Sequence, residues 1–196
     1  MINLFRRFFF LLLAGLAIAA CETPVPVQRL PEITFTHLPS LGLNVANIDV
    51  VTEYKGPMAA PNVEHLMPTS PETAIKRWIE DRIVAKGVGN VARFTISDGA
   101  VTETQLDVET GITGAFKTQQ ALRYDATVAG MLEIFDERGF RKAFASARVS
   151  RSRTLGEDAS VNAREQLWFE LVEALMRDFN AEMEKNLRAH VGAYVM

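Results

Sequence analysis

The scarcest residue in this chain of 196 is cysteine, which occurs once, at Cys21. A single thiol cannot close an internal disulfide, and it cannot supply the ligands of an iron–sulfur cluster or a cysteine-bound zinc site. The folded state must therefore be stabilised by an ordinary apolar core, which a chain of this length can provide.

The chain also has no excess of positive charge. Its 21 lysine and arginine residues are outnumbered by 24 aspartate and glutamate residues, so the formal net charge is −3. Proteins that bind nucleic acid present a basic surface, because they must neutralise phosphate groups. The composition therefore indicates a protein without a nucleic-acid partner.

Motifs that would indicate catalysis or metal binding are missing. The three histidines, His37, His65 and His190, do not lie at a ligand spacing such as i, i+4. The sequence contains no phosphate-binding glycine loop, no dinucleotide-binding motif and no nucleophile elbow. Adjacent acidic residues fall in predicted turns, at helix starts or on opposite faces of a strand. We therefore expect a protein that is not an enzyme, with no catalytic residue, no metal site and no cofactor.

The one long apolar run lies at the beginning of the chain, from Phe8 to Ala20. It is too short to span a bilayer, which requires roughly 20 apolar residues. Arg6 and Arg7 precede the run and small residues end it, which is the layout of a secretory signal peptide. Residues 1–20 are therefore predicted to be removed on export. Their loss takes away two arginines and no acid, which changes the net charge from −3 to −5.

The four residues that end this segment, Ile18-Ala19-Ala20-Cys21, resemble the lipobox of bacterial lipoproteins. The resemblance implies a diacylglyceryl group on the Cys21 sulfur, cleavage just before this residue and acylation of the new amino terminus. Two or more acyl chains anchor a protein stably to a membrane. Glu22 stands where aspartate commonly retains lipoproteins in the inner membrane, which favours the outer membrane. The alternative is an ordinary signal peptide followed by a chance cysteine.

Residues 21–40 contain four prolines, at positions 24, 26, 31 and 39. Proline fixes φ and lacks an N–H, so the segment is predicted to be an extended spacer between the lipidated cysteine and the folded domain. A disordered tether is the alternative. All eight prolines lie between positions 24 and 71, so the rest of the chain is free to form regular structure.

The remainder, residues 41–192, is predicted to be one α+β domain. Alternating apolar residues predict strands over 41–54, with a possible break near Asn47, and over 90–106, 119–136 and 140–153. Residues 108–118 are rich in glycine and threonine and are predicted to be a loop. Asp98-Gly99 indicates either a two-residue hairpin or a bulge in one long strand.

Two helices are predicted from caps and apolar stripes. Ser70 and Pro71 provide an N-cap and a first-turn proline for a helix that Gly87 ends. A longer helix opens at Asp158 to Ser160, ends at Gly192 and carries a stripe wide enough to lie across a sheet. At about 1.5 Å per residue, its end should protrude beyond a small sheet or bend. We therefore expect an antiparallel sheet of three to five strands with both helices packed on one face.

Basic residues gather on and beside the last predicted strand. Alternation places Arg151 and Arg153 on one face and Arg148 on the other, with Arg141 near the start of the strand. Arginine side chains suit phosphate and carboxylate groups, so these four are candidate contacts for an anionic ligand or an acidic partner. A solvated face that protects a sheet edge from aggregation explains the same residues.

The order of elements in the mature chain resembles the small envelope lipoproteins that assist transport machines. The LPS-assembly lipoprotein and the auxiliary lipoproteins of ABC-type lipid transport share the lipidated cysteine, strand, helix, meander and long amphipathic helix. The resemblance implies a non-enzymatic accessory subunit of an envelope transport or assembly complex, with a membrane anchor at Cys21 and a protein partner. The alternative is a periplasm-facing module that binds a lipid or glycan in a cavity between the helices and the sheet.

Overall fold

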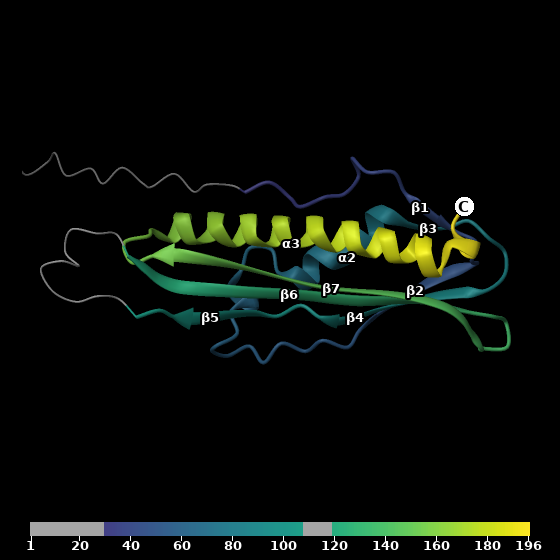
Figure 1. Ribbon diagram of the computed structural model, residues 1–196, viewed down its shortest axis with the longest axis horizontal. Coiled ribbons are helices and arrows are strands. Elements are labelled where there is room, and N and C mark those ends of the chain that lie inside the picture. Colours follow the sequence, from purple (N-terminus) through teal and green to yellow (C-terminus); the bar gives the residue numbers. More distant parts are fainter. Residues whose placement is uncertain (1–29, 108–118) are drawn as a thin grey trace, which may run out of the picture.

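The computed structural model describes residues 30–107 and 119–196. The predicted signal peptide, Cys21 and the predicted loop 108–118 lie outside the described residues. The elements, in chain order, are β1 (Leu41–Leu43), β2 (Asn47–Thr52), η1 (Glu64–Leu66), α2 (Pro71–Arg82), β3 (Ile83–Ala85), β4 (Val91–Asp98), β5 (Val101–Gln105), β6 (Gln120–Phe135), β7 (Arg141–Gly156), α3 (Val161–His190) and η3 (Gly192–Tyr194). Figure 1 shows their arrangement, with β6, β7 and α3 running along the length of the molecule.

Five strands form the main sheet, in which β6 pairs on both edges. β4 and β5 pair antiparallel with one edge of β6, end to end, and β7 pairs antiparallel with the other edge. Where β4 gives way to β5, Asp98 accepts a hydrogen bond from the N–H of Ala100 (3.0 Å) and the register with β6 shifts. Asp98-Gly99 therefore interrupts one long strand, which is the second of the two predicted alternatives.

The predicted class, a single α+β domain with two helices, is confirmed. The sheet was predicted to be antiparallel throughout. The observed sheet is mixed, because one pair of its strands, β2 and β4, is parallel. A parallel pair needs a crossover connection. The segment between β2 and β4 supplies it with η1, α2 and β3.

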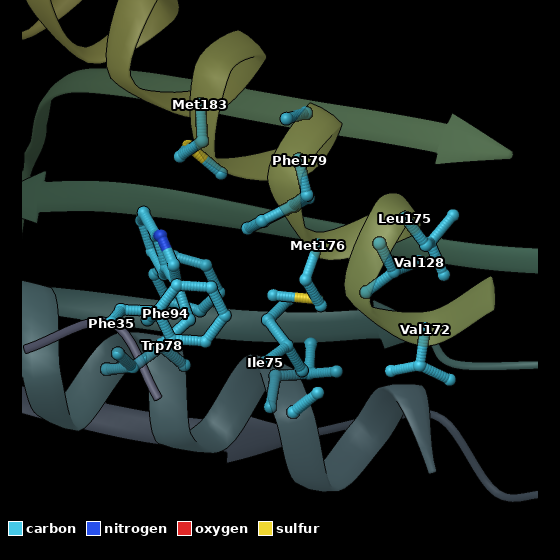
Figure 2. Close-up of a cluster of buried hydrophobic side chains, with 14 of the residues drawn as sticks. Phe35, Ile75, Trp78, Phe94, Val128, Val172, Leu175, Met176, Phe179 and Met183 are labelled. Atoms are coloured by element: carbon cyan, nitrogen blue, oxygen red, sulfur yellow. The ribbon is translucent and has the colours of Figure 1, made fainter. Parts of the chain in front are cut away.

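The core lies between the sheet and the two helices. Trp78 of α2 contacts the ring of Phe94 on β4 (centroids 5.9 Å apart) and the ring of Phe179 on α3 (5.3 Å), so one indole joins both helices to the sheet (Figure 2). Its Nε1 donates a hydrogen bond to the side chain of Asn180 (2.8 Å). Full burial of a large apolar side chain stabilises a fold by about 1.5–3 kcal/mol, so this cluster holds the two layers together.

A second, parallel sheet joins β1 and β3. The break predicted near Asn47 separates β1 from β2, and the two strands belong to different sheets. The helix predicted to reach Gly87 ends earlier, at Arg82, because the next three residues extend to pair with β1. The apolar residues of this segment thus serve a strand and not a last helical turn.

Residues 31–39, called the strap below, were predicted to be part of the tether and pack onto the domain instead. Ile33 and Phe35 are buried in the core cluster, and the Phe35 N–H donates a hydrogen bond to the carboxylate of Asp81 on α2 (2.7 Å). Arg82 donates to the carbonyl of Pro39. Proline favours an extended chain, and an extended chain can still bury alternate side chains, which explains the difference.

The long helix α3 does not protrude beyond the sheet. Leu187 in its last turn and Val191 just after it are both buried. A helix of 30 residues is about 45 Å long, and a strand of 16 residues spans roughly 50 Å, so the helix matches β6 and β7 in length. The prediction failed because it assumed a small sheet.

A candidate docking surface on the β6–β7 hairpin

β7 is an edge strand of 16 residues. It pairs with β6 along its whole length, from Arg141 opposite Phe135 to Gly156 opposite Gln120. Within residues 30–107 and 119–196, no strand pairs with its other edge. An edge of this length presents a row of backbone donors and acceptors to any extended chain that approaches.

In every second residue of β7, the backbone N–H and C=O point outward, that is, away from β6 and toward the free edge of the sheet. On β6, the N–H of Thr127 bonds to the carbonyl of Ala100, away from β7, so Thr127 and its partner Ser150 form a non-hydrogen-bonded pair. The N–H and C=O of Ser150 therefore point away from β6. The register is constant over residues 143–155, which extends the alternation along the strand. The outward-facing residues are Phe144, Ser146, Arg148, Ser150, Ser152 and Thr154.

The end of α3 covers one part of this edge. The side-chain amide of Asn186 donates a hydrogen bond to the outward carbonyl of Ser146 (2.8 Å). Two open grooves of about 420 and 530 Å³ lie between this part of β7 and α3, and Ser146 and Asn186 line both. Toward the other end of β7, from Arg148 to Thr154, the outward backbone groups meet no other strand in the described residues.

β7 contains five cations and no acid. Arg141 pairs with Glu133 on β6 (2.8 Å), Arg148 with Asp98 at the end of β4 (2.6 Å), and Arg151 with Asp178 on α3 (2.5 Å). Lys142 and Arg153 make no ion pair with any described carboxylate. Among the described residues, the only hydrogen bond of the Arg153 side chain is a long one to the neighbouring carbonyl of Ser152 (3.5 Å).

The four candidate arginines therefore do not converge on one anion site. Arg148 extends from the helix-free face of the sheet, while Arg151 and Arg153 extend from the face that α3 covers, as the alternation predicts. Arg141 lies at the hairpin end. The hydrogen bond from Arg151 holds the pKa of Asp178 below its usual value, so this carboxylate stays ionised as the partner of the arginine. The arrangement suits an extended partner better than a compact ligand.

Three arginine–phenylalanine pairs surround the turn of the hairpin. The guanidinium carbon of Arg138 lies 5.5 Å from the ring centre of Phe140, and that of Arg141 lies 4.8 Å from the ring centre of Phe144. A third pair, between Arg93 on β4 and Phe135 on β6, has a distance of 5.3 Å. Arginine and aromatic side chains are enriched where proteins bind one another.

The turn itself is well defined. Asp136 accepts hydrogen bonds from the backbone N–H groups of Arg138 (3.0 Å) and Phe140 (2.9 Å), and Gly139 takes the positive φ of 82° that the turn requires. The hydrogen bond from the Phe140 N–H holds the pKa of Asp136 below its usual value. These hydrogen bonds therefore define the backbone of the turn, from which Phe140 extends.

The candidate docking surface consists of the outer edge of β7 and the turn that precedes this strand. Phe140 and Phe144 belong to it, and the sequence analysis did not single them out. Their side chains are 63% and 49% exposed. The signal was present for Phe144, because it falls out of phase with Ala143, Ala145 and Ala147, which form the apolar face of the strand. Phe144 is thus a large aromatic residue on the polar face of an amphipathic strand.

The described residues give no sign of a metal centre or a membrane span. No three histidine, cysteine, aspartate or glutamate side chains among them come close enough to hold a metal ion. None of the helices in residues 30–107 and 119–196 combines the length and the apolar character needed to cross a membrane.

Fold and surface together define a single α+β domain with a basic edge strand whose outer edge pairs with no other strand in the described residues. No protein-family model matches the chain, and no curated protein matches its sequence. Solved structures similar to it include a minor lipoprotein from Acinetobacter baumannii, known from a 2.35 Å crystal structure. That match has a TM-score of 0.35 and 12% sequence identity, and it covers 74% of this chain and 94% of the other. A similarity of this size says nothing about function.

Proposed function

We propose that this chain is a lipid-anchored envelope protein that serves as a non-enzymatic accessory subunit of a membrane transport or assembly complex. Cys21 carries the anchor, and the domain faces the periplasm from the outer membrane. The proposal for the anchor rests on the lipobox-like residues that end the apolar run. The proposal for the accessory role rests on the shape and chemistry of the β6–β7 hairpin.

The single observation that carries the accessory role is the outer edge of β7. Edge strands are commonly shortened, covered or bent to prevent unwanted pairing. β7 is long, and from Arg148 to Thr154 nothing in the described residues pairs with it. A partner that pairs with this strand would satisfy its backbone groups, as happens when proteins recognise an extended peptide by strand addition.

No observation favours the alternative, a module that binds a lipid or glycan inside the domain. The space between helices and sheet is filled by large side chains, among them Trp78, Phe94 and Phe179 (Figure 2). The hollows found in the described residues are surface grooves, and one of them, of about 490 Å³, lies between the strap and α3, where Ile33, Phe35 and Phe169 line it.

The anchor is tested by replacing Cys21 with alanine. We expect the Cys21→Ala variant to incorporate no labelled fatty acid and to leave the membrane fraction, because the sulfur that carries the lipid is gone. Thr23→Ala is the matched control, since it changes a neighbouring residue and leaves the lipobox intact. Membrane fractionation with continued fatty-acid labelling of Cys21→Ala would refute the anchor.

The accessory role is tested by affinity isolation from native envelopes in mild detergent, with chemical crosslinking and mass spectrometry. We expect one membrane protein in fixed stoichiometry with this chain. Recovery of the chain alone, or with bound lipid and no protein, would refute the accessory role.

A further inference from the structure

We propose that the partner adds one extended, acidic strand to the outer edge of β7, over residues 148–154. This inference rests on the proposed accessory function and names the chemistry of the partner at that surface. The partner strand would be recognised by the outward-facing backbone groups of β7 and by the cations on either side of them.

The backbone of β7 provides the affinity. Arg148, Ser150, Ser152 and Thr154 each turn an N–H and a C=O outward, and their spacing is that of a strand. The small side chains of Ser150 and Ser152 leave the approach open on the helix-free face. An added strand would therefore continue the main sheet beyond β7.

The charges of β7 select an acidic partner. The mature chain is predicted to be acidic overall, yet this one strand carries only cations. Arg151 already has Asp178 as its partner, whereas Arg153, on the same face, has no carboxylate among the described residues. Opposite charges on neighbouring strands stabilise a sheet and like charges destabilise it. We therefore place a carboxylate of the partner strand beside Arg153.

A second copy of this chain does not fit the same edge. Two β7 strands paired edge to edge would bring the same cations of both copies together, and neither strand contains an acid. A free lipid or a phosphate ion could bind the arginine side chains, but it would leave the backbone N–H and C=O groups from Arg148 to Thr154 without a hydrogen-bond partner. An acidic segment of a different protein meets both requirements.

The site is tested in native envelopes with the full-length chain. A photo-crosslinking amino acid is placed at Ser150 or Ser152 on the edge, or at Lys76 on the exposed surface of α2 as a control. We expect Ser150 and Ser152 to crosslink to one segment of a different protein, and mass spectrometry to show acidic residues in that segment. Lys76 should give no such product.

Two pairs of variants separate the backbone from the charge. Ser150→Pro removes an outward N–H and leaves the β6–β7 hydrogen bonds in place, since edge strands tolerate proline at such positions, and Ser150→Ala keeps that N–H. Arg153→Glu reverses the charge, and Arg153→Lys keeps it. We expect Ser150→Pro and Arg153→Glu to lower the yield of crosslinked partner by about tenfold or more, while the two conservative variants retain it. Far-ultraviolet circular dichroism and thermal unfolding verify that each variant folds.

The outcomes distinguish this inference from the accessory role. A stoichiometric partner that crosslinks elsewhere, or that Ser150→Pro and Arg153→Glu still bind as well as the wild type does, overturns strand addition and leaves the accessory role standing. Crosslinks from Ser150 to a second copy, or to lipid alone, also overturn strand addition. If affinity isolation recovers no partner at all, both proposals fail.

Discussion

At the scale of single residues, Gly130 shows how tightly the core is packed. It lies in the middle of β6 opposite Ile96, and a Cβ atom added there would approach ring atoms of Phe94 to 2.6 and 2.8 Å. Glycine is unfavourable within a strand, so its presence reflects the close approach of an aromatic ring. The Phe94 ring in turn contacts Trp78, which links the sheet to both helices.

We expect Gly130→Ala to destabilise the domain by about 1–3 kcal/mol, because the Phe94 ring must move within a filled core. Urea denaturation followed by tryptophan fluorescence measures the change in the free energy of unfolding. Gly192→Ala is the matched control, since an added Cβ there has no atom within 4 Å. An equal effect of the two substitutions would contradict this account of Gly130.

At the scale of elements, a carboxylate fastens the connection between β2 and α2 to β5. Glu64 accepts hydrogen bonds from the hydroxyl of Tyr54 (2.8 Å), the N–H of Val101 (3.1 Å) and the side chain of Asn62 (3.3 Å). Burial raises the pKa of Glu64, but hydrogen bonds from backbone N–H groups, Tyr54 and Asn62 outweigh it, so the pKa lies below its usual value. The ionised form is therefore the one that holds the connection in place.

A carboxyl whose pKa is lower in the folded state stabilises the fold above its unfolded pKa of about 4.3, and this contribution is lost as the pH falls through the folded pKa. We expect Glu64→Gln to be less stable than the wild type near neutral pH, and the difference to shrink as the medium is acidified below that unfolded value. Urea denaturation at several pH values measures it. Glu32→Gln, at an exposed position, should follow the wild-type profile. A difference in the free energy of unfolding that does not change with pH would show that the charge of Glu64 does not contribute to stability.

Local signals in the sequence predicted the elements well, and pairing over long distances was harder. Ser70 caps α2 as expected and Ser160 caps α3, each accepting a hydrogen bond from the N–H three residues later (3.2 Å). The parallel pairing of β2 with β4 was not predicted, since local alternation carries no information about strand direction. In the candidate docking surface, alternation placed Arg148 and Arg151 on the correct faces. Their partners lie 50 and 27 residues away in sequence, and no local pattern identifies them.

At the scale of the whole molecule, the strap is tied to both helices. Arg82 of α2, which is only 1% exposed, donates to the carbonyl of Pro39 in the strap and pairs with Glu184 of α3 (2.5 Å). The chain between Cys21 and the packed domain therefore has about half the length that the proline pattern predicted. Nine residues from 22 to 30 can span at most roughly 30 Å, so a lipid on Cys21 would keep the domain close to the membrane.

Two truncated chains test this domain boundary, one starting at residue 30 and the other at residue 41. The first keeps the strap, and we expect it to unfold at the same temperature as a chain that starts at residue 21. The second loses the buried side chains of Ile33 and Phe35, whose removal should cost at least about 4 kcal/mol in the free energy of unfolding. Differential scanning calorimetry and urea denaturation compare the two. Equal stability would mean that the strap contributes nothing to the fold and acts as a tether, so that a lipid on Cys21 would hold the domain at a greater distance from the membrane.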